Sequence, residues 1–112
     1  MTDEVLTATQ SLVAYINAHY DGYIDSTNHE KSFNESMKAS HRNSIKSGTV
    51  YLKVTGNGSV QFFVDKVTGD ILKAASWNAP AKGVRGNVLS GINGLEAFND
   101  TGIGLLQVRY LK

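Results

Sequence analysis

Residues 50–72 read VYLKVTGNGSVQFFVDKVTGDIL, and this stretch decides the fold because two turn signals divide it into three apolar runs. Asn57-Gly58 is a strong signal for a two-residue hairpin turn, since both positions favour residues that accept a positive φ. Thr68-Gly69 marks the second turn, with Gly69 in the left-handed position. The stretch therefore predicts three consecutive strands of an antiparallel meander.

A helix is predicted before the meander, because apolar residues recur there at helical spacing. Thr2 is suited to the N-cap, and Asp21-Gly22 predicts the end of the helix, because glycine accepts the left-handed conformation at which helices stop. The residues that define its apolar face are Val5, Leu6, Thr9, Leu12, Val13, Ile16 and Tyr20.

Residues 26–47 are rich in Ser, Asn, Lys and His, and their secondary structure is less clearly indicated than that of the first helix. Phe33, Met37, His41 and Ile45 lie four residues apart, which favours a second helix with a thin apolar seam. A mobile loop is the alternative, because Ser and Asn side chains compete for the backbone hydrogen bonds of a helix.

The segment after the meander, residues 76–87, reads SWNAPAKGVRGN and is interrupted by the only proline and two glycines, so we expect a loop there. Residues 105–110 predict a last strand. The order predicts an α+β domain with one or two N-terminal helices packed on one face of a small antiparallel meander. Residues 1–112 are expected to form a single domain.

The composition narrows the classes of partner. The chain has 112 residues, of which 41% are hydrophobic, so its core is modest and a homo-oligomer is expected to complete the burial. A net charge of +1 argues against nucleic acid as a partner and against attraction to anionic membranes. No segment reaches the roughly 20 apolar residues of a membrane span. The absence of cysteine excludes disulfides and thiolate metal sites.

The candidate site residues centre on the 76–87 segment. Trp77 offers an aromatic face for a base, Arg85 can donate two parallel hydrogen bonds to a phosphate, and Lys82 adds a point charge. Alternatively, Trp77 is a core anchor and Arg85 is a surface charge or an ion-pair partner of Asp65 or Asp70. The full set of candidate ligand-binding residues is Tyr51, Phe62, Lys73, Trp77, Lys82, Arg85, Asn87 and Arg109.

No catalytic group stands out in the sequence. His19, His29 and His41 lack the spacing that places two imidazoles on one helical face for zinc. Ser76 and Ser90 lie near no histidine in sequence and in no nucleophile-elbow pattern. We therefore expect no catalytic residue, no metal and no cofactor, and a protein that binds without catalysing a reaction.

The same part of the chain carries a spaced pattern shared by a group of small bacteriophage-encoded proteins. The pattern consists of Phe63-Val64-Asp65, Thr68-Gly69-Asp70, Lys73, Trp77, Pro80-Ala81-Lys82 and Arg85-Gly86-Asn87. Within that group, the order of a helical part, an antiparallel sheet and a short last strand resembles the Thoeris anti-defence family of signal sponges. Those proteins bind cyclic ADP-ribose isomers made by bacterial TIR-domain immune enzymes without cleaving them, and some also bind cyclic trinucleotides.

The resemblance implies a phage protein that sequesters a cyclic nucleotide immune signal, is a homo-oligomer and works in the cytoplasm of the infected bacterial host. It also implies that Arg85 binds phosphate, that Tyr51 or Trp77 stacks on the base, and that Asn87 makes polar contacts with the base edge. Three other functions stay open on the residues alone: a single-stranded nucleic-acid-binding protein, an inhibitor that acts on a host factor through a protein interface, and a small hydrolase or other enzyme.

Overall fold

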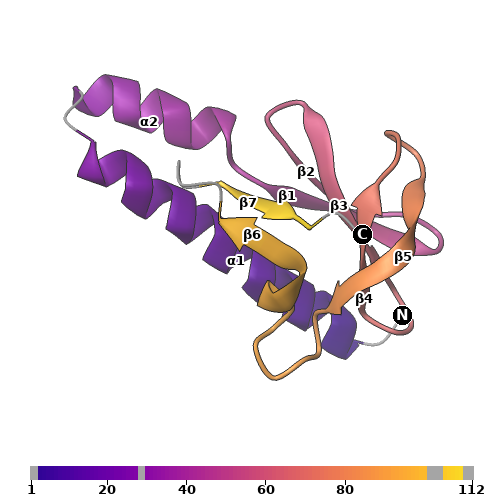
Figure 1. The fold of residues 1–112 in the computed structure, drawn as a ribbon. Helices are drawn as coiled ribbons and strands as arrows, with labels where there is room; N and C mark the ends of the chain where they lie inside the picture. The colour runs from indigo at the N-terminus through magenta and orange to yellow at the C-terminus, as the bar shows by residue number, and fades with distance from the viewer. Residues whose placement is uncertain (1–2, 28–29, 101–104, 110–112) are drawn as a thin grey trace.

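A computed structural model describes residues 3–27, 30–100 and 105–109 of the chain (Figure 1). These residues form two helices, followed by seven strands and one short 3-10 helix. In chain order the elements are α1 (Asp3–Ser26), α2 (Lys31–Ser40), β1 (Ser44–Ser47), β2 (Tyr51–Gly56), β3 (Ser59–Asp65), β4 (Asp70–Ala74), β5 (Pro80–Asn87), η1 (Leu95–Ala97), β6 (Phe98–Asp100) and β7 (Leu106–Val108). The fold is α+β, as predicted.

The main sheet is a five-stranded antiparallel meander in the order β1-β2-β3-β4-β5. Both predicted turns are confirmed. Asn57 and Gly58 have φ values of 53° and 75°, and Gly69 has a φ of 82°. These turn residues fix the β2–β3 and β3–β4 connections, so local sequence chemistry sets the centre of the sheet.

The face of the sheet that looks toward α1, here called the inner face, is wholly apolar at its centre. The strand register places Leu52 opposite Val64 and Val54 opposite Phe62, so that these side chains point the same way. The central residues of this face are at most 1% exposed: Leu52, Val54, Phe62, Val64 and Ile71.

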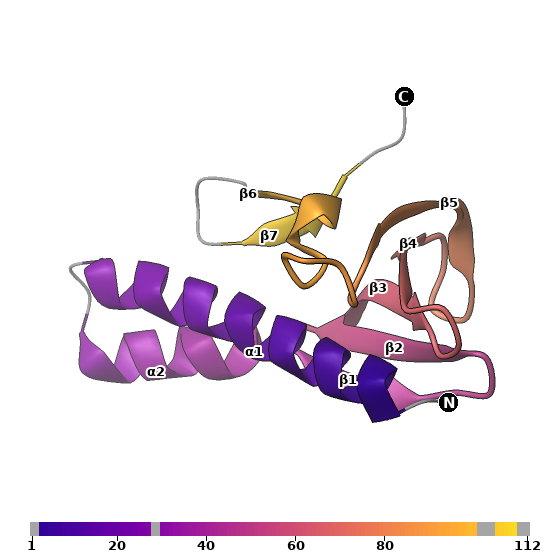
Figure 2. The ribbon, with the colours of Figure 1, turned by 90° about the horizontal axis from the view of Figure 1, so that it is seen from below.

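α1 and the β6–β7 ribbon cover the inner face. Val5, Leu12 and Ile16 of α1 belong to the same buried cluster as the sheet residues. Phe98 of β6 packs edge-on against Phe62, with ring centroids 5.2 Å apart. Figures 1 and 2 show the C-terminal half of α1 and the whole of α2 projecting beyond the sheet as a helical hairpin.

α1 is longer than predicted, because it continues through Asp21-Gly22 to Ser26. A glycine in a helix costs only about 1 kcal/mol relative to alanine. Ile24, at 5% exposure, buries its side chain in the turn that follows. Burial of this residue therefore outweighs the local stop signal. Thr2, the expected N-cap, lies outside the described residues.

The predicted second helix is confirmed only over Lys31–Ser40. Ile45 does not continue its apolar seam, because it lies on β1 opposite Val54 and packs against the core cluster. The regular four-residue spacing from Phe33 to Ile45 therefore does not mark one helix, because it runs from α2 into β1. α2 itself has no buried residue.

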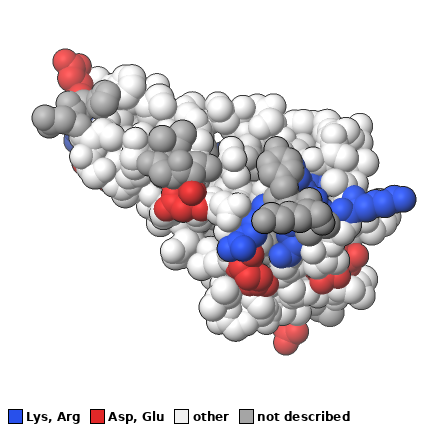
Figure 3. All heavy atoms as spheres, viewed as in Figure 1, with Lys and Arg blue, Asp and Glu red and all other residues white. Residues whose placement is uncertain are grey.

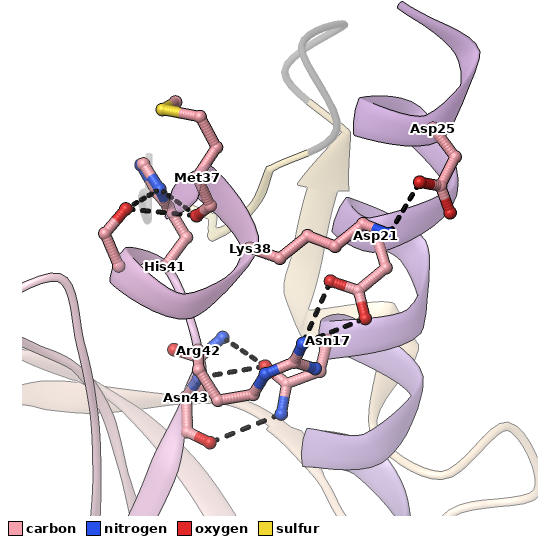
Figure 4. A network of polar contacts seen from close by, with 9 residues as sticks. Asn17, Asp21, Asp25, Met37, Lys38, His41, Arg42 and Asn43 are labelled. Atoms are coloured by element: carbon pink, nitrogen blue, oxygen red, sulfur yellow. Dashed lines mark hydrogen bonds and ion pairs between the residues drawn. The ribbon is translucent and has the colours of Figure 1, made fainter. Parts of the chain in front are cut away.

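Polar contacts hold α2 and its C-terminus against α1 (Figure 4). The ammonium of Lys38 lies 2.5 Å from a carboxylate oxygen of Asp25. The Nη2 of Arg42 donates to both carboxylate oxygens of Asp21, at 3.2 and 3.0 Å. Exposed ion pairs of this kind typically contribute about 0–1 kcal/mol each, so α2 is one of the less firmly attached parts of the fold.

The predicted loop over residues 76–87 is wrong for most of its length, because residues 80–87 form the edge strand β5. Pro80 is the first residue of this strand, a position where a missing N–H is tolerated. Two register shifts between β4 and β5 accommodate the irregular sequence. The last predicted strand exists as β7, but it pairs with β6 and not with the meander. Tyr110 lies outside the described residues.

No helix in the described part of the chain is both long and apolar enough to cross a membrane.

Candidate functional site

A cleft with two adjoining cavities lies between β3 and the β6–β7 ribbon. The two cavities share a wall made of Gln61, Phe62, Leu106 and Gln107. The cavity on the side of α1, here the helix-side cavity, has a volume of about 250 Å³. The other, here the ribbon-side cavity, has a volume of about 180 Å³. Each is smaller than the roughly 300–1,000 Å³ that is usual for a site that encloses a whole drug-sized ligand.

Among the residues that the structure describes, those lining the helix-side cavity include hydrogen-bonding groups but no Lys, Arg, Asp or Glu. Its lining consists of Ile16, Tyr20, His41, Asn43, Gly56, Asn57, Ser59, Gln61, Phe62, Leu105, Leu106 and Gln107. Tyr20 and His41 stack against each other in one wall, with ring centroids 4.6 Å apart and an interplanar angle of 28°. An uncharged wall of this kind suits a neutral, planar group better than an ion.

Hydrogen bonds orient the polar groups of this wall. The His41 Nδ1 lies 3.1 Å from the Met37 carbonyl oxygen, which can only accept, so we assign the Nδ1–H tautomer (Figure 4). The Tyr20 hydroxyl oxygen, 3.2 Å from the same nitrogen, then keeps its own hydrogen for another acceptor. Burial, and then the neighbouring Tyr23 and Asp21, raise the pKa of the Tyr20 hydroxyl. The hydroxyl is therefore a donor at neutral pH.

Gln61 is the second oriented group of the helix-side cavity. Its Nε2 donates to the Gly56 carbonyl oxygen at 2.9 Å and to the Ser59 hydroxyl oxygen at 3.0 Å. Both amide hydrogens are used by these contacts, so the side chain presents its carbonyl oxygen as an acceptor. The cavity thus combines a hydroxyl donor with an amide acceptor.

Cationic residues on the ribbon-side cavity and on the neighbouring parts of β5 and the end of β7 are here called the basic end: Lys73, Lys82, Arg85 and Arg109. Lys73 lines the cavity together with Phe98 and Val108, on the inner face opposite Phe62. Arg109 follows directly on β7, and its Nε lies 3.3 Å from the Phe98 carbonyl oxygen. Figure 3 shows Lys and Arg side chains gathered where β5 and β7 meet.

Arg85 connects β5 to the end of β7. Its Nη1 donates to the carbonyl oxygens of Lys82 and Gly83 at 2.8 and 2.7 Å, and its Nε donates to that of Arg109 at 3.3 Å. Among the described residues, none of the ion pairs within 4.0 Å involves Lys82, Arg85 or Arg109. Backbone contacts thus orient Arg85 and Arg109, and neither they nor Lys82 have a carboxylate within 4.0 Å in the described part of the chain, which favours an anionic ligand.

The structure brings together four of the eight predicted site residues, since Lys73, Lys82, Arg85 and Arg109 form the basic end. The ion pairs of Arg85 with Asp65 or Asp70 that we considered as an alternative do not form. Asp65 instead accepts hydrogen bonds from the backbone N–H groups of Val67 and Thr68, at 2.8 and 3.0 Å.

Phe62, another candidate ligand-binding residue, is only 1% exposed and forms part of the core and the cleft wall, so its ring is not an exposed stacking surface. Its neighbour Phe63 is the one that points away from α1, because the register pairs it with Lys53 on the opposite face. Alternation along the strand required one outward phenylalanine, but the sequence did not specify which.

Asn87 is not free to contact a ligand as predicted. Its Nδ2 donates to the Thr68 carbonyl oxygen at 2.8 Å and to an Asp70 carboxylate oxygen at 3.0 Å. Its Oδ1 accepts from the Leu89 N–H at 2.8 Å. The side chain joins the end of β5 to the β3–β4 turn, so its role is structural.

Tyr51 and Trp77 lie away from the cleft. Both belong to the opposite, outer face of the main sheet, where Tyr51 packs edge-on against Phe63 at 5.7 Å. Trp77 is 48% exposed, which contradicts the alternative that it is a core anchor. The aromatic and arginine residues of the predicted nucleotide-binding loop are thus divided between two faces of one sheet.

Sequence reasoning missed the residues of the helix-side cavity, above all Tyr20, His41, Gln61 and Gln107. Tyr20 was seen only as part of the helical apolar face, and His41 only as part of a second seam. Their contact joins positions 21 residues apart, and no motif connects them. In the described part of the chain no group of three or more His, Asp or Glu is placed to hold a metal ion.

Comparison with known proteins gives a family but no activity. The model of a family described as "Family of unknown function (DUF7717)" matches residues 1–104. No curated protein and no solved structure matches the chain significantly. Because the match covers nearly the whole sequence, the chain belongs to the DUF7717 family of unknown function.

Proposed function

We propose that the protein is a non-catalytic binding protein that sequesters a small phosphorylated nucleotide in the cleft. The observation that carries this proposal is the union of an uncharged cavity with a basic end. A nucleotide has the same two parts, a neutral planar base and an anionic phosphate. The base would occupy the helix-side cavity and the phosphates would lie at the basic end.

The helix-side cavity is matched to a base in size and chemistry. At about 250 Å³ it is smaller than a typical site for a whole drug-sized ligand but large enough for one ring system. The Tyr20 hydroxyl and the Gln61 carbonyl offer one donor and one acceptor to the edge of the ring. A buried polar group that loses water must regain such contacts, which is how an uncharged cavity gains selectivity.

The basic end is matched to phosphate. Arg85 uses Nε and Nη1 for carbonyl oxygens, which leaves Nη2 to donate to a phosphate oxygen. Arg109 and Lys73 supply further positive charge from β7 and β4. Charge-assisted hydrogen bonds to phosphate are about twice as strong as neutral ones, so this end would supply much of the affinity.

The resemblance to the Thoeris anti-defence family makes a cyclic ADP-ribose isomer the ligand we expect, because it combines an adenine base with a pyrophosphate. Sequestration requires tight binding without chemistry, and a largely preformed cleft reduces the ordering cost of binding. In this proposal the protein withholds an immune signal in the infected bacterial cell and acts as a homo-oligomer.

Native mass spectrometry of the purified protein with the product mixture of a TIR-domain cyclase tests the proposal. We expect a mass increment equal to an intact cyclic ADP-ribose isomer, and recovery of the unchanged compound after denaturation. The same spectra give the number of subunits. Absence of an increment, or release of a cleaved product, would contradict the proposal.

Variants connect the binding to the cleft. Arg109→Gln is expected to weaken binding roughly tenfold or more, because it removes a charged donor to phosphate. Lys31→Gln is the matched control, since Lys31 is a highly exposed lysine on α2. For the base, Tyr20→Phe is expected to weaken binding a few-fold, whereas Tyr23→Phe, one turn further along α1 and outside the cavity lining, leaves it unchanged.

A further inference from the structure

The outer face of the main sheet carries a second concave surface that the cleft does not use. This outer groove has a volume of about 410 Å³ and lies over the β1–β2 turn and the neighbouring strands. The lining residues that matter for its chemistry are Lys46, Tyr51, Lys53 and Phe63. Trp77 stands beside it, in the connection between β4 and β5.

Two lysines face each other in this groove without a carboxylate to separate them. Lys46 of β1 is paired directly with Lys53 of β2 in the sheet register. Like charges in directly opposite positions destabilise a sheet. In the described part of the chain, the ion pairs within 4.0 Å include neither lysine. The arrangement works against stability, so a function in anion binding explains it better than a structural role.

Aromatic rings surround the two ammonium groups. The Trp77 ring centroid lies 5.6 Å from the Lys46 Nζ and 4.8 Å from the Lys53 Nζ. Phe63 forms the floor at 2% exposure, and Tyr51 packs against its edge. Trp77 remains 48% exposed, so much of the indole is available to a ligand.

We infer that the outer groove binds single-stranded nucleic acid. Aromatic faces that stack on bases, next to lysines that meet phosphates, form the usual surface for this ligand, and every base can stack whatever the sequence. Lysine contributes point charges, which suit a passing phosphate backbone. The net charge of +1 argues against bulk attraction, but two unneutralised lysines in one groove act locally.

This inference is independent of the proposed function of the cleft. The register places Phe62 on the inner face and Phe63 on the outer face, so the cleft and the outer groove lie on opposite sides of the sheet. A variant in one site does not remove contacts of the other. Either proposal can therefore fail while the other holds.

Fluorescence of Trp77, the only tryptophan of the chain, provides the first test. The probe is a single-stranded oligothymidylate of about twelve nucleotides, within the usual range of site sizes. We expect quenching at low salt, with a plot of log K against log salt whose slope is about −1.4, as for two neutralised phosphates. Lys53→Gln is expected to reduce that slope by about 0.7. Lys31→Gln is the matched control and leaves it unchanged.

Fluorescence anisotropy of a labelled oligothymidylate gives a second readout that does not depend on tryptophan emission. Trp77→Leu is expected to weaken binding roughly 5- to 150-fold through loss of stacking. Arg109→Gln, in the cleft, is expected to leave it unchanged. The inference would be overturned by an absence of binding at low salt, or by an unchanged salt slope in Lys53→Gln. Stronger binding of oligoglutamate than of oligothymidylate, or a concentration-dependent burial of Trp77 between copies of the protein alone, would also overturn it.

Discussion

The two faces of the main sheet bury similar rings among different neighbours. On the inner face, Phe62 lies among aliphatic side chains and packs edge-on against Phe98. On the outer face, Phe63 is just as buried, but a tyrosine and a lysine cover it. Burial alone therefore does not distinguish a core from a binding surface. The neighbours of the buried ring do, because apolar neighbours add stability whereas unpaired lysines reduce it.

The largest expected effect tests this comparison directly with two neighbouring phenylalanines. Phe62→Ala is expected to lower the free energy of unfolding by roughly 3–5 kcal/mol, since it opens a cavity in the closed core. Phe63→Ala is expected to cost about half as much, because water can enter the space that it leaves on the outer face. Denaturation in urea, followed by circular dichroism, measures both.

Equal losses for the two variants would show that the outer face is a second core. In that case the lysines and aromatic rings of the outer groove would be parts of the packing, and their availability to a ligand would be doubtful. The emission of Trp77 provides a further check, since Phe63→Ala is expected to shift it to the red and Phe62→Ala is not, provided that the variant remains folded.

The second-largest expected effect is a loss of stability on substitution of Gly94, in the loop that packs against Ile71 of the inner face. Gly94 has a φ of 84°, and a Cβ at this position would lie 2.5 Å from the Cδ1 of Ile71, which is fully buried. Gly94→Ala is therefore expected to lower the free energy of unfolding by about 2–3 kcal/mol, from backbone strain and overpacking together.

Gly91→Ala is the matched control for this loop, because a Cβ there would meet nothing within 4 Å. We expect a change of less than about 0.5 kcal/mol. A similar cost for both variants would mean that general loop stiffness, and not contact with the inner face, determines the effect. Urea denaturation again supplies the comparison.

Elements that are determined by their own residues could be predicted from the sequence, whereas elements that depend on contacts with distant residues could not. The β2–β3 and β3–β4 turns followed from their own residues, Asn57-Gly58 and Thr68-Gly69. The continuation of α1 past Gly22 did not, because burial of Ile24 decides it. Strand β5 was hidden for a related reason: its glycines and proline have poor strand propensity, and pairing with β4 supplies the order.

The candidate site was predictable in residue type but not in arrangement. Lys73, Lys82, Arg85 and Arg109 were all candidate ligand-binding residues, but their grouping depends on tertiary contacts such as the one between the Arg85 Nε and the Arg109 carbonyl oxygen. The tautomer of His41 and its contact with Tyr20 depend on tertiary packing that no spacing in the sequence encodes. The arrangement of the site therefore could not be predicted, because it depends on contacts between segments that are far apart in the sequence.

A fall in pH is expected to remove stability contributed by one carboxylate on each side of the sheet, Asp65 and Glu96. On the outer face, the backbone N–H of Thr68 is the main cause that lowers the pKa of Asp65 below its ordinary 3.8. On the inner side, burial raises the pKa of Glu96, but hydrogen bonds from the Asn87 N–H and the Ser90 hydroxyl outweigh it, so its pKa lies below 4.5. A lowered folded pKa stabilises the protein above the unfolded value, and this contribution disappears as the pH falls through the folded pKa.

Stability is therefore expected to decrease as the pH falls below about 4.5, with both carboxylates taking part. Urea denaturation at a series of pH values from about 6 to 3 measures the slope. Asp65→Asn and Glu96→Gln are each expected to flatten it, and the double variant more than either. If Asp65→Asn alone removed the whole dependence, the acid response would belong to the outer-face turn and not to both sides.

The smallest expected effect is the coupling between Trp77 and Lys53, whose ammonium lies 4.8 Å from the indole centroid. A double-mutant cycle with Lys53→Met and Trp77→Leu is expected to give a coupling free energy of about 0.5–1 kcal/mol, as for other exposed cation–π pairs. Removal of the like charge opposite Lys46 would offset part of the loss, so Lys53→Met alone is expected to be nearly neutral.

A coupling above about 2 kcal/mol would require a desolvated pair. Such a coupling would mean that the lysines and the indole pack against each other as part of the folded structure. The outer face would then contribute to stability, as the inner face does, and not to ligand binding.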